Sequence, residues 1–208
     1  MNSFTIYTNR YLKQNIKGFY HTNYTGHRNI GNPDYLNDLK NTFGNFSSWK
    51  LKEASEKLKK VLKYDFTYIQ QNTQIINLTI CVIPRAKAKK SYTKNQLLFR
   101  STVKSVIKKI DGFENGLKYI VRHTDTKTTH LAHSQYGGDG DMPYVGITKD
   151  TCTISSNVQG KDILLIDDIY TRGVNIDEDA IQALLDNGAK SVIFYAVGKT
   201  KWYIQKIQ

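Results

Sequence analysis

The stretch that decides the fold is a run of aliphatic residues leading into two acids and a short turn, Ile163-Leu164-Leu165-Ile166-Asp167-Asp168-Ile169-Tyr170-Thr171-Arg172-Gly173-Val174-Asn175. An uninterrupted aliphatic run is typical of a strand that is buried on both faces of a parallel sheet. The two acids follow at the carboxyl end of this strand, which is the edge where open α/β sheets bind ligands. The pattern therefore predicts a central strand with a binding site at its end.

A helix is expected directly after this turn. Asn175 suits the N-cap, and the acids Asp177, Glu178 and Asp179 favour the positive end of the helix dipole. Apolar residues recur at helical spacing over residues 176–185, and residues 191–197 are typical of a further strand. The three elements together predict a strand–helix–strand unit with parallel strands.

The stretch 163–175 resembles the phosphoribosyl-diphosphate-binding signature of the type I phosphoribosyltransferases. The signature of that family is a hydrophobic strand, two acids, two mostly aliphatic positions and a loop of small residues. The resemblance implies an α/β fold in which helices flank a central parallel sheet and an N-terminal hood lies over it. It also implies transfer of a phosphoribosyl group, in which a nucleophile displaces pyrophosphate from ribose C1. The sequence does not identify this nucleophile.

The resemblance implies a role for each residue of the signature. Asp167 and Asp168 would hold the ribose hydroxyls and would contact Mg²⁺ indirectly, through the substrate or water. The 5′-phosphate would be held by the loop that follows, which consists of Thr171, Arg172, Gly173, Val174 and Asn175. Gly173 has no Cβ and lets the backbone approach the anion closely. A purely structural alternative is that the paired acids end a strand and precede a helix cap.

A second candidate for substrate binding follows the predicted strand at residues 75–84. The basic loop 85–90 comes next, and residues 93–110 are predicted to be a helix. This arrangement resembles the pyrophosphate loop of the same transferases, and the Lys94-Asn95-Gln96 sequence resembles the ComF-like branch. Pyrophosphate is therefore expected to contact Arg85, Ala86 and Lys87, although the same residues also suit a solvated basic loop.

A polar segment at residues 122–133 follows a strand predicted at 117–121. It resembles the catalytic loop of the family in its position and composition, and it makes Arg122 and Lys127 candidate catalytic residues. Such a loop would exclude water from the reacting ribosyl centre. The histidines of this segment do not have the spacing of a zinc site. A strand or ribbon is expected over residues 144–157.

Residues 1–74 differ in composition from the rest and are predicted to form an N-terminal hood or appendage on a core of residues 75–208. They are rich in Asn, Tyr, Thr and Lys, with helices expected at 33–43 and 48–64. Their aromatic residues either anchor the appendage to the core or stack on a base. In the family that the signature resembles, the hood recognises the nucleophile.

Length and charge limit the function further. A chain of 208 residues is long enough for one α/β domain with a substantial core, and its net charge of +12 has two explanations. The charge either attracts a polyanionic substrate or contacts nucleic acid. The alternative function is therefore a nonenzymatic regulator that senses a nucleotide or phosphoribosyl diphosphate and contacts nucleic acid.

The remaining sequence features predict a cytoplasmic protein. No signal peptide or membrane-spanning stretch is recognisable, and Cys81 and Cys152 read as reduced core residues. A homodimer is possible by resemblance to the family. The tripeptide Gly198-Lys199-Thr200 invites comparison with a nucleotide-binding P-loop. However, the position of the first glycine of that motif is occupied by Ile193 within a strand, so this alternative is rejected.

Overall fold

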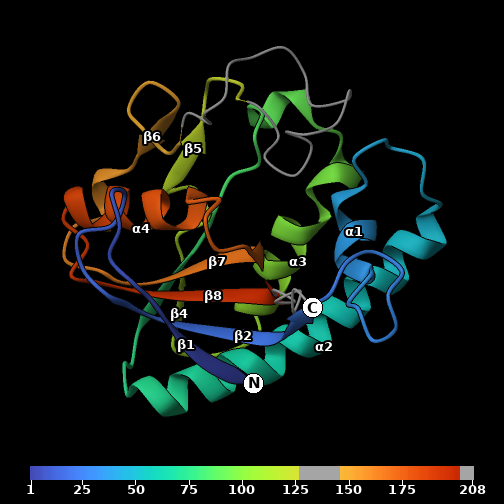
Figure 1. The fold of residues 1–208 in the computed structure, drawn as a ribbon, viewed down its shortest axis with the longest axis horizontal. Helices are drawn as coiled ribbons and strands as arrows, with labels where there is room; N and C mark the ends of the chain where they lie inside the picture. The colour runs from blue at the N-terminus through green and yellow to red at the C-terminus, as the bar shows by residue number, and fades with distance from the viewer. Residues whose placement is uncertain (127–145, 202–208) are drawn as a thin grey trace, which may run out of the picture.

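The computed structural model describes residues 1–126 and 146–201, and its main feature is a six-stranded sheet in the order β1-β2-β8-β7-β3-β4 (Figure 1). The strands of this sheet are β1 (Asn2–Ile6), β2 (Ile16–Tyr24), β3 (Leu78–Val82), β4 (Phe113–Asn115), β7 (Asp162–Tyr170) and β8 (Ser191–Thr200). β1 pairs antiparallel with β2 at one edge, and all other neighbours in this sheet pair in parallel. An additional ribbon pairs β5 (Ile120–Arg122) with β6 (Cys152–Ile154). The predicted α/β class with a mainly parallel central sheet is confirmed.

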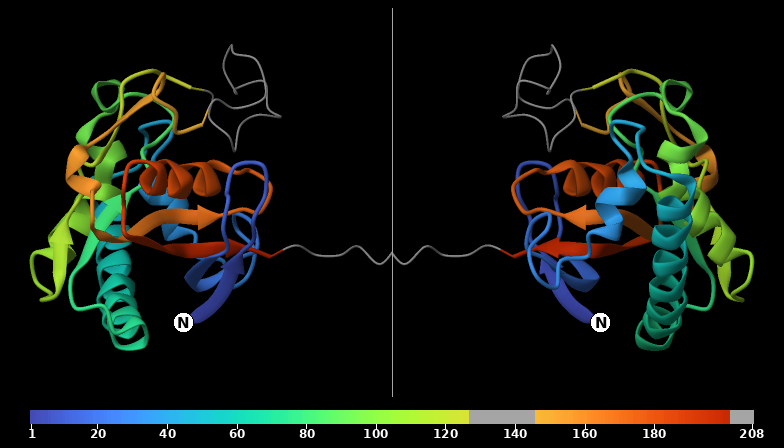
Figure 2. Two further views of the ribbon diagram at one scale, coloured as in Figure 1. Left: turned by 90° about the vertical axis from the view of Figure 1, so that its left-hand side faces the viewer. Right: turned by 90° about the vertical axis from the view of Figure 1, so that its right-hand side faces the viewer.

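Helices cover both faces of the sheet (Figures 1 and 2). α4 (Ile176–Asp186) packs on one face, and α1 (Tyr35–Lys40), α2 (Ser48–Thr73) and α3 (Leu98–Ile107) pack on the other. The aliphatic run of β7 serves both layers, because successive side chains of a strand point to opposite faces. Leu164 and Ile166 belong to the core cluster with α2 and α3, whereas Ile163 and Leu165 belong to the cluster with α4.

The β7–α4–β8 unit is present as predicted, but β7 is longer than its aliphatic run. Ile169 pairs with Gly198, and Tyr170 pairs with Lys199 of β8. Asp167 and Asp168 are therefore the sixth and seventh of the nine residues of a paired strand, so the sheet fixes their backbone. This is a more rigid setting than the strand end that the sequence predicts.

Residues 1–74, predicted as a hood or appendage, share the sheet and the hydrophobic core with the rest of the chain. β2 lies between β1 and β8, with Gly18 opposite Phe194 and Tyr24 opposite Thr200. α2 joins the core cluster that includes strands β3, β7 and β8. The part that lies over the carboxyl edge of the sheet is smaller, and consists of α1 and the residues around it.

The helix boundaries differ from the predicted ones for local reasons. α2 extends to Thr73 because Phe66 and Ile69 continue its buried stripe beyond residue 64. α1 ends at Lys40 because Asn41 adopts a left-handed conformation with φ of 40°. The predicted helix at 93–110 is a 3₁₀ turn, Lys94–Leu97, followed by α3. This turn starts at a capping box in which Thr93 and Gln96 satisfy each other's backbone donors.

Two further expectations concern the cysteines and the membrane. Cys81 and Cys152 are both buried and free, as predicted for core residues. Burial raises the pKa of the Cys81 thiol to about 12, which keeps it protonated at neutral pH. Within residues 1–126 and 146–201, every helix is too short or too polar to cross a bilayer.

Candidate functional site

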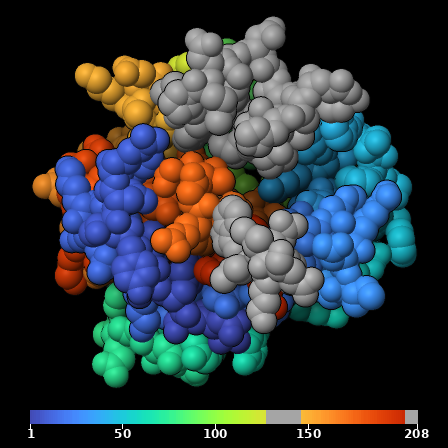
Figure 3. All heavy atoms as spheres, viewed as in Figure 1, coloured from blue at the N-terminus to red at the C-terminus, as the bar shows by residue number. Residues whose placement is uncertain are grey.

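The carboxyl ends of β7 and β8 open into a cleft of about 580 Å³. One wall is formed by the end of β7, the loop after it and the start of α4, and the other is formed by α1 and residues 42–46. Figure 3 shows the orange surface of the β7–α4 region between the dark blue N-terminal strands and the lighter blue region around α1. The signature stretch therefore faces the N-terminal part of the chain across this cleft.

Both acids of the signature line the cleft. The Asp168 backbone N–H donates to Asp167 Oδ1 at 2.8 Å, and Lys40 Nζ lies 3.2 Å from Asp168 Oδ2. Burial raises the pKa of Asp167, the negative charge of Asp168 raises it further, and the positive charge of Lys40 opposes both effects. The structure thus places the predicted acids together and adds Lys40, which sequence reasoning missed.

A third acid, Asp177, reaches the same cleft from the first turn of α4. Its side chain is 1% exposed, and Oδ1 has no hydrogen-bond partner within the described chain. Burial and the neighbouring charge of Asp167 raise its pKa well above the usual range. The sequence predicts for Asp177 only an interaction with the helix dipole, because the orientation of its side chain depends on how α4 packs against β7. Three carboxyl groups consequently meet at one end of the cleft.

The helix α4 is held against β7 by a buried contact between aromatic and acidic side chains. Tyr170 Oη donates to Glu178 Oε1 at 3.0 Å, and both residues are almost fully buried. Tyr170 also packs against Phe4 and Phe194, with ring centroids 5.0 and 5.6 Å away. This contact gives the buried hydroxyl of Tyr170 an acceptor. It fixes the direction in which the loop between β7 and α4 leaves the sheet.

The loop 171–175 forms a tight turn between β7 and α4. Val174 N–H donates to the Thr171 carbonyl at 3.2 Å, and Thr171 Oγ1 lies 2.7 Å from Thr200 Oγ1. Thr171 and Val174 line the cleft, and Gly173 adopts a φ of +85° that favours glycine. Arg172 is exposed beside them. The turn leads the chain into a helix whose first amides have no partner within the helix, which suits an anion.

Asn175 differs from its predicted role as a capping side chain. It occupies the N-cap position, but its backbone is left-handed with φ of 64°, and its side chain makes no capping hydrogen bond. Instead, Asn175 Nδ2 donates to the Gly173 carbonyl at 2.9 Å. The side chain thus stabilises the turn itself and leaves the first amides of α4 uncapped.

The predicted pyrophosphate residues lie in the segment that follows β3, beside the acids, but the Arg85 side chain and backbone groups of Ala86 and Lys87 are engaged elsewhere. Arg85 Nη1 donates to the carbonyls of Lys40 and Gln96, at 2.7 and 2.6 Å. The Ala86 carbonyl accepts from both the N–H and Oγ1 of Thr126, and Lys87 N–H donates to Tyr92 Oη. None of the three residues lines the cleft in the described part of the chain. The structure therefore places this segment beside the acids, whereas the described contacts of the three residues are made with other parts of the chain.

Of the two candidate catalytic residues in the polar segment 122–133, the structure describes Arg122 but not Lys127. Arg122 is 4% exposed within the β5–β6 ribbon and does not line the cleft. Lys127 lies outside the described residues. Thr126, which immediately precedes it, is bonded to Ala86, so the described beginning of this segment lies against the loop after β3.

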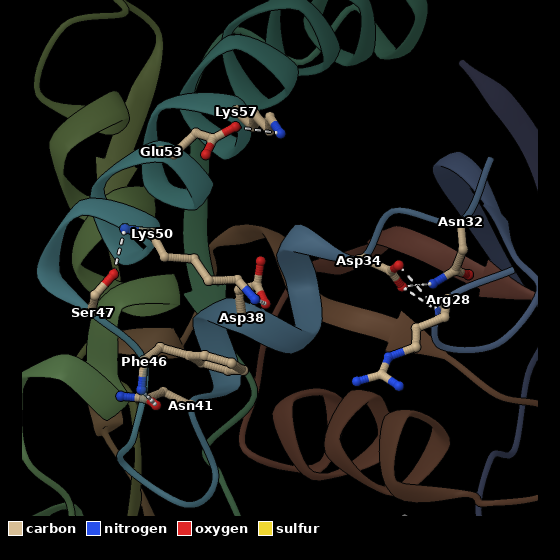
Figure 4. A network of polar contacts seen from close by, with 10 residues as sticks. All are labelled: Arg28, Asn32, Asp34, Asp38, Asn41, Phe46, Ser47, Lys50, Glu53 and Lys57. Carbon is tan, nitrogen blue, oxygen red and sulfur yellow. Dashed lines mark hydrogen bonds and ion pairs between the residues drawn. The ribbon is translucent and has the colours of Figure 1, made fainter. Parts of the chain in front are cut away.

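The wall opposite the acids is a compact polar arrangement around α1 and the start of α2 (Figure 4). Ser47 Oγ accepts from Lys50 N–H at 3.3 Å and caps α2, and Asn41 Oδ1 accepts from Phe46 N–H at 3.3 Å. Lys50 Nζ lies 2.9 Å from Asp38 Oδ1 in a smaller cleft of about 280 Å³ between the two helices. The charged pairs of the smaller cleft satisfy one another, so the larger cleft is the stronger candidate for a ligand.

The acids of the larger cleft have the chemistry that a magnesium ion would need if it were bound together with a phosphate-bearing ligand. In residues 1–126 and 146–201, three or more His, Cys, Asp or Glu side chains are nowhere arranged to hold a metal by themselves. Mg²⁺ commonly binds one or two carboxylates and completes its shell with substrate phosphates and water. Asp167 and Asp168 supply two such carboxylates, and Asp177 adds an unpaired carboxyl oxygen close by.

No protein-family model matches this chain, and no curated protein shows significant sequence similarity to it.

Replacing Gly173 tests two effects at the turn between β7 and α4, namely backbone strain and anion binding. The first is measured as a loss of stability and the second as a loss of affinity. Gly173→Ala places a Cβ at φ of +85°, and beyond the neighbouring residues no atom of residues 1–126 or 146–201 lies within 4 Å of it, so the left-handed backbone opposes the change. We expect a loss of about 1–2 kcal/mol of unfolding free energy. We also expect at least an approximately fivefold weaker affinity for ribose 5-phosphate, the effect of one lost hydrogen bond. Denaturant unfolding and calorimetric titration measure the two effects.

Gly160→Ala is the matched control, because Gly160 has a φ of +70° and equally open surroundings outside the cleft. It should lose comparable stability and keep the affinity of the unmodified protein. Equal affinities of the two variants would show that the turn at Gly173 does not hold the phosphate.

Proposed function

We propose that this chain is a phosphoribosyltransferase that uses 5-phosphoribosyl 1-diphosphate, on a fold of the type I class and with similarity to its ComF-like branch. One observation carries the proposal. Asp167 and Asp168 sit at the carboxyl end of a central parallel strand, and the turn into α4 follows two residues later along the same cleft. The strand and the turn thus hold two groups of polar atoms at a fixed distance from each other. In this proposal, the carboxyl groups of Asp167 and Asp168 accept from the sugar hydroxyls, and the backbone amides at the start of α4 donate to the phosphate.

The acids bind and orient the ribose in this proposal. The 2- and 3-hydroxyls of the sugar form hydrogen bonds with the carboxyl groups of Asp167 and Asp168. The bond to Asp168, which pairs with the ammonium group of Lys40, is charge-assisted and therefore stronger than a neutral one. Because both residues belong to a paired strand, their backbone does not have to be ordered upon binding. Such preorganisation lowers the entropic cost of holding C1 in position.

The turn binds the 5′-phosphate at the other end of the sugar. The hydroxyl of Thr171 and the first amides of α4 donate to phosphate oxygens, and Gly173 allows the backbone to approach them. Arg172 adds a positive charge on the exposed side of the loop. The sugar is thus fixed at two points, and its C1 carbon is directed into the cleft.

In the reaction, the nucleophile forms a bond to C1 while the bond from C1 to the diphosphate oxygen breaks. The bonding electrons leave with pyrophosphate, so negative charge develops on the leaving group. Mg²⁺ held by Asp167 and Asp168 through the substrate or water would neutralise part of this charge. The contribution of the chain itself is positioning and electrostatic stabilisation.

Titration of 5-phosphoribosyl 1-diphosphate with Mg²⁺ tests this proposal. Calorimetry should show one binding event that is tighter for the diphosphate ester than for ribose 5-phosphate and is weakened when Asp168 is replaced. A screen of purines, pyrimidines and small amines for pyrophosphate release then identifies the nucleophile. A protein that binds neither the ester nor ribose 5-phosphate would contradict the proposal.

The second candidate is a regulator that binds the same metabolite without turning it over, and the net charge of +12 favours it. Such a protein would bind duplex DNA or RNA with an affinity that falls steeply with salt, because counterions are released upon binding. Ligand binding and salt-dependent nucleic-acid binding, without pyrophosphate release for any nucleophile, would favour this candidate over the enzyme.

A further inference from the structure

Lys40, the last residue of α1, faces the acids across the cleft. Its Nζ lies 3.2 Å from Asp168 Oδ2, and the two side chains are 21% and 20% exposed. The pair is thus largely buried, but both residues line the cleft. A ligand in the cleft can therefore reach both partners, and its own polar groups can replace the interaction that each partner loses.

The backbone that carries Lys40 is held by side chains from the connection between β3 and α3. Arg85 Nη1 donates to the Lys40 carbonyl at 2.7 Å and to the Gln96 carbonyl at 2.6 Å. Gln96 Nε2 donates to the carbonyls of Asn41 and Thr42, at 3.3 and 3.2 Å. The carboxyl end of α1 is thus tied to the segment in which the sequence places the pyrophosphate site.

The sheet brings this segment next to the acids. β3 and β7 are parallel neighbours, with Val82 opposite Ile166, and Ile83 N–H donates to the Ile166 carbonyl at 3.0 Å. The chain after β3 therefore leaves the sheet beside Asp167. Lys40 bridges the two regions, since its side chain reaches Asp168 while its carbonyl binds Arg85.

The cation that the sequence places at the pyrophosphate, Arg85, has its guanidinium group committed to other contacts. Besides its bonds to the two carbonyls, it lies 4.4 Å from the centroid of the Tyr92 ring. Lys40, in contrast, lines the cleft with its ammonium group. A lysine ammonium is a compact charge with three donors, and it can exchange a carboxylate partner for a phosphate oxygen without a change of fold.

We propose that Lys40 contacts the diphosphate of the bound ribosyl substrate and that Arg85 and Gln96 position it, an inference that rests on the proposed function. In the free protein, Lys40 pairs with Asp168. When the ribose hydroxyls donate to Asp168, Lys40 loses part of this interaction and binds the diphosphate. One substrate thus satisfies both members of the pair.

The test compares Lys40→Met with Lys50→Met by calorimetric titration of two ligands, the diphosphate ester with Mg²⁺ and ribose 5-phosphate. Lys50 is the matched control because it pairs with Asp38 at 2.9 Å and lies outside the larger cleft. For Lys40→Met, the dissociation constant of the diphosphate ester should rise at least about tenfold, the effect of one charge-assisted contact. Affinity for ribose 5-phosphate should remain within about twofold, because that ligand lacks the diphosphate.

The direction of the change distinguishes this role from a simpler one. If Lys40 only neutralises Asp168, its removal frees the acid, and affinity for the diphosphate ester stays the same or increases. That result would overturn the role of Lys40. Lys40→Arg keeps the positive charge and should retain most of the affinity for the diphosphate ester. This variant shows whether position 40 tolerates a substitution, so a loss in Lys40→Met can be attributed to the missing charge. Wild-type protein that binds neither ligand would instead overturn the proposed function, and this inference with it.

Arg85→Met tests positioning when it is made alone and together with Lys40→Met. A positioning residue acts through its partner, so Arg85→Met should weaken binding of the diphosphate ester only while Lys40 is present. Equal losses in both backgrounds would show that Arg85 acts independently of Lys40 and would overturn its positioning role.

Discussion

Asp168→Asn is expected to lower the rate of pyrophosphate release by at least about 100-fold, the usual cost of removing one group that stabilises the transition state. The variant keeps the shape of the side chain and removes its charge. In the proposed complex the ribose hydroxyl would lose its charged acceptor, and Lys40, 3.2 Å from Asp168, loses its carboxylate partner. Pyrophosphate release with the nucleophile found by screening measures the effect.

Asp38→Asn is the matched control for this variant. Asp38 also pairs with a lysine, at 2.9 Å, and its side chain is 15% exposed compared with 20% for Asp168. It lines the smaller cleft instead of the larger one. Any general effect of losing an aspartate–lysine pair should therefore appear in both variants. Full activity of Asp168→Asn would contradict the assignment of the ribose site.

Phe66→Ala is expected to reduce the free energy of unfolding by about 3–5 kcal/mol, as for other large-to-small changes of a buried aromatic residue. Phe66 lies in α2, is fully buried, and packs against Phe113 and Tyr195 with centroid distances of 5.3 and 6.1 Å. Its removal leaves a cavity between the helix and the sheet. Urea unfolding followed by circular dichroism measures the loss.

Tyr64→Ala provides the comparison on the same helix, since Tyr64 is 62% exposed. An exposed substitution of this kind should change the free energy of unfolding by less than about 0.5 kcal/mol. Similar small losses in both variants would indicate that α2 is a peripheral appendage. A large difference would agree with a helix that belongs to the central core.

The strand, the helix and the acids of the signature stretch were predictable because their signals are local. Four consecutive aliphatic residues specify a strand buried on both faces, and the apolar spacing after Asn175 specifies a helix. Both acids were expected at the carboxyl edge of the sheet, and both line the cleft. These features follow from the periodicity of single segments.

The positions of β2 and Lys40 were not predictable, because they depend on contacts between segments that are distant in the sequence. The residues of β2 alternate polar and apolar types irregularly, and only the pairing with β8 defines the strand as an inner one. Lys40 is one of many lysines in the chain, and its approach to Asp168 depends on the bonds of Arg85 and Gln96 to the end of α1.

For Arg85, the sequence predicts the position of the residue but not the partner of its guanidinium group. Its location beside the site follows from the strand that precedes it, but a guanidinium group can serve either an anion or several carbonyls. The sequence contains no signal that separates these two uses. In the structure, the carbonyl of Gln96, the carbonyl of Lys40 and the ring of Tyr92 surround the group.

The insertion of β2 beside β8 affects how the protein is made. On the ribosome, β2 emerges well before the strand on which it depends, β8, and before the next strand of the sheet, β7. Until then, the aromatic and aliphatic side chains of β1 and β2 lack the surface that buries them. Pairing between segments so far apart along the chain is slow and leaves nascent chains open to aggregation. The nascent polypeptide is therefore expected to depend on chaperones until β8 has left the exit tunnel, and truncations before residue 191 should accumulate as insoluble material.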